Sequence, residues 1–221
     1  MLNKQGPNKI DWCDYTWNPI SGRCQHNCPY CYMHSFWRRY PEMAVNQLKE
    51  KYLLDKFPKK PSKIFVGSST DMWGEWVDDI WINEVLRKTK ENPQHSFQFL
   101  TKNPFGYRGW KLPINGWYGT SFDGTMETEN NINNLVTSVS QFRKRFVSFE
   151  PLVKIPKKIC LSGIHWIIIG ADSNKGAARP PIAWAKYLII LAREKNISVF
   201  VKDNYEYPEV IKEFPERLFK Q

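Results

Sequence analysis

The sequence predicts an α/β protein, in which a parallel sheet is covered by helices on its outer face. Two observations predict it. Short runs of apolar or β-branched residues alternate with stretches of helical periodicity along most of the 221 residues. These runs are apolar at nearly every position, which is typical of strands buried on both faces. We find no internal repeat, low-complexity tract or linker, so we expect one domain spanning residues 1–221.

The first half of the chain supplies three expected strands. They are the apolar runs at residues 63–69, 96–102 and 117–122. A helix is expected between the first two, at residues 75–89, because apolar residues recur there near helical spacing: Trp76, Ile80, Val85 and Leu86.

The second half continues the alternation with three more strands, at residues 144–151, 165–172 and 197–203. Between them, residues 125–142 predict a helix with acidic residues near its start and an apolar face: Ile132, Leu135, Val136 and Val139. Residues 180–196 predict another helix, with proline at its start and basic residues toward its end. A short, proline-interrupted helix is expected at residues 207–219.

Small or polar residues follow five of these strands, in the sequences GSSTD, TKN, TSFD, SFEP and GADSN. In open α/β sheets and in β/α barrels, the carboxyl ends of the strands form the ligand-binding face. Five such endings in one chain therefore predict a shared site at that face.

The composition favours an anionic partner. The net charge is +10, and the basic residues are scattered rather than concentrated in one tail. A solvated basic surface remains the alternative to a nucleic-acid-binding face. No apolar run reaches the ~20 residues of a membrane span, and the N-terminus lacks an apolar signal core, so we expect a cytoplasmic protein without a membrane partner.

Three of the five cysteines, Cys24, Cys28 and Cys31, lie within eight positions. In a reduced compartment, clustered thiols indicate metal ligands rather than disulfides. Structural zinc would need a fourth ligand, which the spacing does not supply clearly, although zinc remains an alternative. Three thiolates on a 4Fe-4S cluster leave one iron open for chemistry, and this is the favoured interpretation.

The C-x3-C-x-aromatic-C pattern, with Tyr30 as the aromatic residue, resembles the signature loop of the radical S-adenosylmethionine (radical SAM) superfamily. The resemblance extends to phage-type members known as the Gp37/Gp68 or DUF5131 family. Matching stretches cover most of the chain in order: DYTWNPISG (14–22), FVGSSTDMW (65–73), FLTKNP (99–104), VSFEPL (147–152), IIIGADSNKGAARP (167–180) and VFVKD (199–203). Many members have a longer gap between the first two cysteines.

This resemblance implies a partial (β/α)6 TIM-like barrel that holds a 4Fe-4S cluster and S-adenosyl-L-methionine. One electron, delivered by a reductase or a flavodoxin-type donor, would cleave the cofactor to a 5′-deoxyadenosyl radical, which abstracts hydrogen from a substrate. The basic charge suggests DNA or RNA as that substrate. The catalytic residues stay unknown.

The resemblance also implies cofactor-binding residues at the strand ends. Tyr30 would lie against adenine, or merely pack. Lys102 would pair with the methionyl carboxylate, or be solvated. Residues after the second strand would hold the amino group, although the family's GGE-like pattern is absent: Gly67, Ser68, Ser69 and Asp71. Ribose contacts would come from the later strands, where Glu150 could instead bind substrate or cap a turn: Thr120, Ser121 and Glu150.

Other functions remain open. The same chemistry could act on a peptide or a small metabolite, or the chain could be a non-enzymatic zinc or iron–sulfur module that binds nucleic acid. Trp17 is expected in the core rather than stacked on substrate. Arg179 either binds an anion or braces its loop. Four tryptophans could stack on bases, although core packing explains most of them: Trp73, Trp76, Trp110 and Trp117.

Overall fold

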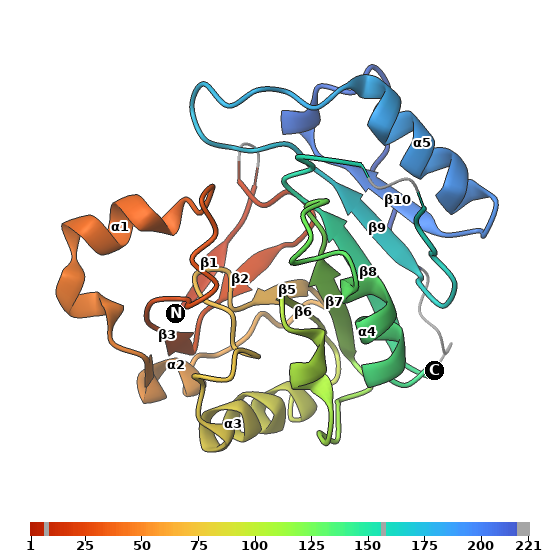
Figure 1. Cartoon of the computed structure of the whole chain (residues 1–221). Coiled ribbons are helices and arrows are strands. Elements are labelled where there is room, and N and C mark those ends of the chain that lie inside the picture. The colour runs from red at the N-terminus through yellow and green to blue at the C-terminus, as the bar shows by residue number, and fades with distance from the viewer. Residues whose placement is uncertain (7–8, 156–157, 216–221) are drawn as a thin grey trace. The chain divides into compact units, whose positions relative to one another are not determined.

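The computed structural model describes residues 1–6, 9–155 and 158–215. The chain divides into two compact units, residues 1–117 and residues 118–221. Each unit alternates strands and helices (Figure 1). The α/β class expected from the sequence is therefore confirmed, and each unit is described on its own below.

Four strands lie side by side in the first unit, in the order β1-β2-β5-β6. Strand β1 (Leu2–Lys4), which the sequence analysis missed, pairs antiparallel with β2 (Tyr15–Trp17). The remaining pairs, from β2 to β5 (Lys63–Val66) and from β5 to β6 (Ser96–Thr101), are parallel. Two of the expected strands are thus confirmed, each ending earlier than its apolar run suggested.

The other elements of the first unit are short, apart from one helix. They are the hairpin strands β3 (Ile20–Ser21) and β4 (Gln47–Leu48), the helices α1 (Met33–Arg39), α2 (Glu50–Leu53) and α3 (Asp79–Lys90), and the 3₁₀ turns η1 (Pro41–Ala44) and η2 (Pro104–Tyr107).

Helix α3 begins later than the apolar spacing predicted. The Asp78 side chain caps it by accepting a hydrogen bond of 2.7 Å from the backbone N–H of Ile80. Ile80 is 69% exposed, and Trp76 precedes the helix, so neither belongs to the buried face. That face consists of Ile82, Val85, Leu86 and Thr89.

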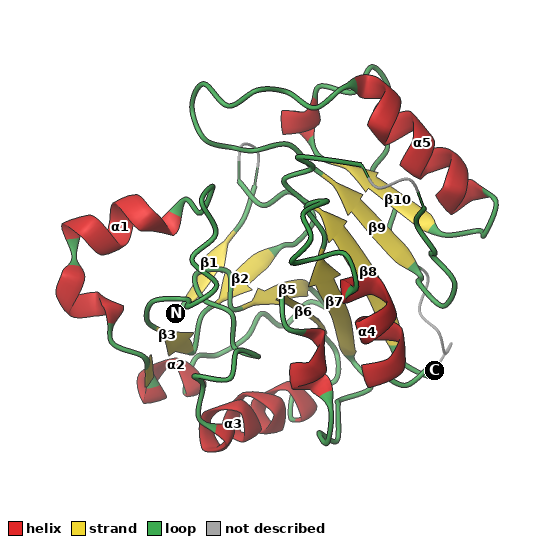
Figure 2. Cartoon of the chain, viewed as in Figure 1, coloured by secondary structure: helices red, strands yellow, loops and turns green. Residues whose placement is uncertain are grey.

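The second unit contains three parallel strands in the order β8 (Lys144–Phe149), β9 (Trp166–Ile169) and β10 (Ser198–Val201). Strand β7 (Gly116–Ser121) contains the boundary between the units. Every residue of β8 and β9 is buried, as the unbroken apolar runs predicted for most of their positions. Figure 2 shows these strands beside loops and helices of the same unit.

Two helices and a 3₁₀ turn complete the second unit: α4 (Asn131–Ser138), which packs on β8, α5 (Ile182–Arg193), which packs on β10, and η3 (Asp203–Tyr205). Helix α4 is shorter than the predicted 125–142. The carboxylate of Asp123 accepts hydrogen bonds from Thr125 and Thr128, and these contacts fold residues 123–128 into a turn instead.

The expected helix at residues 207–219 is wrong for the portion that the structure describes. Residues 207–215 form no helix; Lys212 pairs with Phe200 in an antiparallel bridge, and Trp166 Nε1 donates to the carbonyl of Glu213. Prolines at 208 and 215 disfavour a helix, and the edge of β10 offers these residues alternative backbone partners. Residues 216–219 lie outside the described residues.

Each unit has its own apolar centre. Trp17 is fully buried beside Phe97 in the first unit, and its Nε1 donates to the carbonyl of Tyr52 at 3.0 Å. The expectation that Trp17 belongs to the core is confirmed. In the second unit, Trp166 packs against Phe146, with ring centroids 5.4 Å apart.

A buried histidine in the first unit and a half-buried histidine in the second make stability depend on pH. His95 Nδ1 accepts from the backbone N–H of Ser62, and His165 Nδ1 accepts from that of Arg145, each at 3.1 Å. Burial lowers the pKa of both histidines. The folded state prefers the neutral ring. We therefore expect the stabilising contribution of these histidines to the free energy of unfolding to be complete above about pH 6.5 and to decrease as the pH drops below it.

Urea unfolding at pH 7, 6 and 5 measures this effect. His95→Asn keeps an acceptor for Ser62 without a titrating ring, so its stability should fall less between pH 7 and pH 5 than that of the wild type. Identical pH profiles would contradict the assignment of part of the acid sensitivity to His95.

Candidate functional site

The three clustered cysteines lie on one loop of the first unit, residues 22–32, here called the cysteine loop. It connects β3 to α1. The N–H of Cys31 donates to the carbonyl of Cys28 at 2.9 Å, and Asn27 adopts a left-handed conformation with φ of 48°. Cys24, Cys28 and Cys31 are free thiols that are half-buried.

The surroundings of Cys24 and Cys31 favour their protonated thiols when no metal is bound. Burial raises the pKa of Cys24 to about 11 and also raises the pKa of Cys31. The neighbouring Cys28 adds to both shifts. Binding of a metal must therefore release protons from this loop.

The donor set fits a cluster by its chemistry, since three soft thiolates on one loop are ligands that iron–sulfur clusters prefer. In the described part of the chain, no three histidine, cysteine or acidic side chains lie close enough together to hold one metal ion. The ligands of a cluster each bind a different iron, so they need not converge on a single point.

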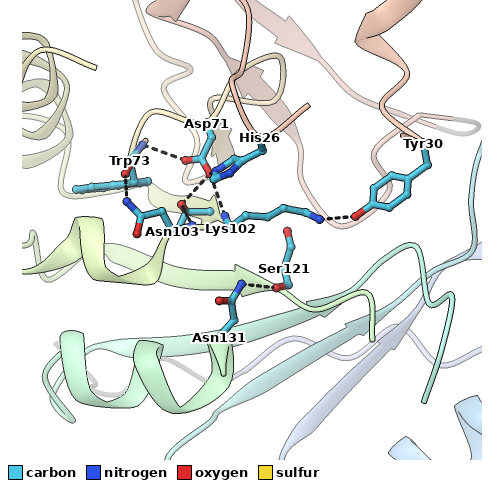
Figure 3. Close-up of polar contacts among 9 residues, drawn as sticks. His26, Tyr30, Asp71, Trp73, Lys102, Asn103, Ser121 and Asn131 are labelled. Carbon is cyan, nitrogen blue, oxygen red and sulfur yellow. Dashed lines mark hydrogen bonds and ion pairs between the residues drawn. The ribbon is translucent and has the colours of Figure 1, made fainter. Parts of the chain in front are cut away.

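Asp71 joins the cysteine loop to the ends of two strands (Figure 3). Its Oδ2 accepts hydrogen bonds from His26 Nε2 at 2.8 Å, from Thr101 Oγ1 at 2.8 Å and from the N–H of Lys102 at 2.9 Å. Its Oδ1 accepts from the N–H of Trp73 at 3.0 Å. The carboxylate is 9% exposed in this site and holds the loop through the side chain of His26.

Lys102 and Tyr30 form a second link to the cysteine loop. Lys102 Nζ bonds to the Tyr30 hydroxyl and lies 4.9 Å from the centroid of its ring. Figure 3 shows the lysine extended from the end of β6 toward Tyr30. Two residues predicted from the sequence are therefore in direct contact, although they are far apart in the chain.

The segment after β5 turns sharply beside the same loop. Gly67 has φ of +78°, and a Cβ on it would come within 2.9 Å of the Thr70 carbonyl, so the turn requires glycine. The hydroxyl of Ser68 bonds to the Asn18 side chain, and its carbonyl accepts from Tyr32. Ser69 lies half-buried beside them. Thus the predicted amino-group segment does lie against the cysteine loop.

A cleft of about 540 Å³ opens beside these contacts. It is lined by residues of the loop and of the segments after β5 and β6: Gln25, His26, Glu75, Trp76, Lys102 and Asn103. The ring of His26 meets that of Trp76 edge to face, with centroids 5.0 Å apart. The first unit thus combines thiols, a cation and hydrogen-bonding amides at the ends of its parallel strands.

The remaining predicted residues lie in the second unit. Thr120 is fully buried, whereas Ser121 is half-buried and its carbonyl accepts from Asn131 at 3.2 Å. Glu150, after β8, forms an ion pair with Lys202, after β10. A Cβ added to Gly170, after β9, would meet both of these side chains, so the pair lies against that glycine.

Arg179 braces its own loop, as one interpretation of the sequence proposed. Its Nε donates to Glu206 at 3.0 Å and its Nη1 donates to the carbonyl of Asp172 at 3.2 Å. Trp73 and Trp117 are buried, in agreement with core packing, while Trp76 borders the cleft.

Sequence reasoning missed the roles of His26, Thr101 and Lys202. Nothing in the spacing of His26 indicates an acidic partner 45 positions away. Lys202 stands after an apolar strand in VFVKD, the same signal that selected Lys102 and Glu150. That signal was sufficient to include Lys202 as well.

Fold and site together define an α/β protein with a three-cysteine loop at the carboxyl ends of parallel strands. The chain belongs to the family described as "Protein of unknown function (DUF5131)", whose profile matches residues 7–217. No curated protein matches the sequence.

Among solved structures, the chain is similar in fold to variants of spore photoproduct lyase. One, with bound AdoMet and dinucleoside spore photoproduct, has a TM-score of 0.50 at 10% identity, over 78% of this chain and 59% of that one. Another, with dinucleoside spore photoproduct, gives the same values. The present chain thus spans about three-fifths of the length of these proteins.

Proposed function

We propose that this protein is a radical SAM enzyme that acts on a component of nucleic acid. The observation that carries the proposal is the three-thiol cysteine loop, held by Asp71 and Lys102 at the carboxyl ends of β5 and β6. The likeness in fold to spore photoproduct lyase and the resemblance of the C-x3-C-x-aromatic-C loop to the radical SAM signature support it.

Cys24, Cys28 and Cys31 would each ligate one iron of a 4Fe-4S cluster. The bound cluster would supply an open iron for S-adenosylmethionine and the electron that cleaves it to a 5′-deoxyadenosyl radical. The hydrogen bonds from His26 and Lys102 to Asp71 would keep the loop, and hence the thiols, in position for this chemistry.

The strand-end residues would bind the cofactor. We assign Tyr30 to the adenine, Lys102 to the carboxylate, and the turn formed by Gly67, Ser68 and Ser69 to the amino group. Asp71 would act through the loop and the turn that it joins. In the second unit, ribose contacts would come from three strand-end residues: Thr120, Ser121 and Glu150.

The substrate class rests on charge and on aromatic side chains. A net charge of +10 favours a polyanion, and an unpaired base would suit a radical enzyme because it can bring one C–H bond to the cofactor. The similar spore photoproduct lyase structure contains a bound dinucleoside spore photoproduct, a ligand of that protein.

We further propose that the chain is a single domain. A reductase or flavodoxin-type donor in the cytoplasm would supply it with electrons. The described residues include no helix with the length and apolarity needed to cross a membrane.

One anaerobic assay tests the proposal. Reconstituted protein, S-adenosylmethionine and dithionite should yield 5′-deoxyadenosine, and modified products should form in a panel of DNA and RNA. A protein that binds zinc and produces no 5′-deoxyadenosine would overturn the enzymatic proposal. Production of 5′-deoxyadenosine with turnover of only peptides or small metabolites would overturn the substrate class alone.

Gly170→Ala tests the participation of the Glu150–Lys202 pair. A Cβ at position 170 would lie 2.9 Å from Glu150 Cδ and 3.0 Å from Lys202 Cδ, so both side chains must move. Because these atoms belong to flexible side chains, we expect the fold to survive while 5′-deoxyadenosine formation falls about 10- to 100-fold.

The control is Gly6→Ala, where a Cβ would meet nothing within 4 Å. It should change neither the rate nor the thermal midpoint. A Gly170→Ala protein that folds normally and keeps the wild-type rate would remove Glu150 from the proposed site.

A further inference from the structure

The segment around the cysteine loop has an unusual charge pattern. From residue 15 to residue 41 the sequence contains no acidic residue, although the chain as a whole has 22. The same segment holds three arginines and seven aromatic residues. Such a combination of positive charge and aromatic rings suits a ligand that is both anionic and planar in part.

Helix α1 exposes several of these arginine and aromatic side chains, at least in part, to solvent. None of its residues is buried, and Arg38 and Arg39 in its last turn are exposed. In Figure 1 the helix stands apart from strands β2 and β5 of its own unit. A helix that buries no residue receives little stabilisation from packing, which suggests that its side chains serve a partner.

The aromatic residues of α1 form a row. The ring centroids of Phe36 and Trp37 are 4.9 Å apart, and those of Phe36 and Tyr40 are 5.1 Å apart. The guanidinium of Arg39 lies 5.4 Å from the centroid of Tyr40. Tyr32, which precedes the helix, is 53% exposed. Partly exposed rings and exposed guanidinium groups are therefore gathered on one short helix and the residues that flank it.

We propose that this surface, the α1 face, binds single-stranded nucleic acid. It consists of Tyr32, Phe36, Trp37, Arg38, Arg39 and Tyr40. Arg38 and Arg39 pair with phosphates, and the rings stack on unpaired bases. The inference deepens the proposed function, on which it rests for its biological meaning, because it names the substrate class and the place where that substrate docks.

The chemistry of the face favours this occupant over others. A second copy would bring arginines against arginines, and an acidic peptide would lack planar groups to match the aromatic row. In duplex DNA the flat faces of the bases are buried in the stack, whereas an unpaired base can expose a face to an aromatic ring. Charge and stacking together therefore select an unpaired strand.

The position of the face agrees with a substrate role. Tyr32 is adjacent in sequence to Cys31, and its hydroxyl bonds to the carbonyl of Ser68 in the turn after β5. The α1 face therefore begins at the residue that follows a proposed iron ligand. This arrangement would deliver an unpaired base to the cysteine loop.

Fluorescence anisotropy with labelled single-stranded DNA and RNA, over a range of salt concentrations, tests the proposal with the full-length chain. The double variant Arg38→Ala/Arg39→Ala should bind more weakly, and its slope of log affinity against log salt should fall by about 1.4, since each phosphate contact on a single strand contributes about 0.7. Trp37→Leu keeps an apolar side chain but removes the stacking ring. It should weaken binding about 5- to 150-fold without changing the slope.

The matched control is Lys59→Ala/Lys60→Ala, which removes two exposed charges of the same unit outside the α1 face. Its salt slope should stay near that of the wild type. An unchanged slope in the arginine variant, or an equal loss in both double variants, would overturn the proposal. So would a Trp37→Leu change that alters self-association in sedimentation but leaves oligonucleotide affinity intact.

The outcome is separable from that of the proposed function. If the wild type makes no 5′-deoxyadenosine but the variants lose oligonucleotide binding as described, the docking surface stands and the enzymatic proposal fails. If 5′-deoxyadenosine forms and the variants bind oligonucleotides like the wild type, the enzymatic proposal stands and the docking surface is wrong.

Discussion

Replacement of Cys28 by alanine is expected to abolish both cluster binding and the cleavage of S-adenosylmethionine while leaving the protein folded. Cys28 lies between Cys24 and Cys31 on the cysteine loop and adds to the raised pKa values of both. Removing it leaves two donors where three are needed to hold three irons. The side chain is half-buried in a loop rather than in either apolar core, so the loss of one thiol should cost about 1 kcal/mol of stability or less.

The measurement is iron content, the visible absorbance of the anaerobically reconstituted protein and the yield of 5′-deoxyadenosine. Cys160→Ala is the matched control because Cys160 is an exposed free thiol of the second unit, away from the cysteine loop in sequence. The control should keep wild-type iron and yield. A Cys28→Ala protein with full iron and full 5′-deoxyadenosine production would refute the ligand assignment.

Six of the strands, β5 to β10, could be predicted from the sequence because apolar residues dominate their runs, whereas the short strands β1 to β4 were not predicted. Residues 166–169 are apolar at every position, so hydrophobicity indicated their place without any tertiary information. The same reasoning placed Lys102 and Glu150 at strand ends. Where local polar contacts compete with periodicity, the prediction failed: the Asp123 turn shortened α4, and the Asp78 cap delayed α3.

The contacts within the site could not be predicted in the same way. Asp71 meets His26 and Lys102 only because folding brings the cysteine loop over the ends of β5 and β6, and no periodicity reports such a meeting. The GSSTD segment indicated only that Asp71 is a polar residue near the expected cofactor. The structure adds that its carboxylate accepts hydrogen bonds from both the cysteine loop and the end of β6, which makes it a connection between loop and sheet.

Asp71→Asn should therefore loosen the cysteine loop. The Oδ2 atom accepts three hydrogen bonds and Oδ1 a fourth, but an amide has only one oxygen. Whichever of the two oxygens it replaces, the NH2 group of the amide would face another hydrogen-bond donor at a nearly buried position, and that donor would lose its acceptor. Because hydrogen bonds to a charged group contribute about 1.5–3 kcal/mol each, we expect the free energy of unfolding to fall by about 2–4 kcal/mol.

Urea unfolding measures the stability, and the rate at which a chelator removes iron from the reconstituted protein measures the hold on the loop. Iron should leave the variant faster than the wild type, whereas Glu42→Gln, at an exposed carboxylate of the same unit, should change neither quantity. A double-mutant cycle with His26→Asn isolates the contact. If Asp71 holds the loop through His26, the two substitutions should be coupled by about 1 kcal/mol or more, and strict additivity would refute the connection.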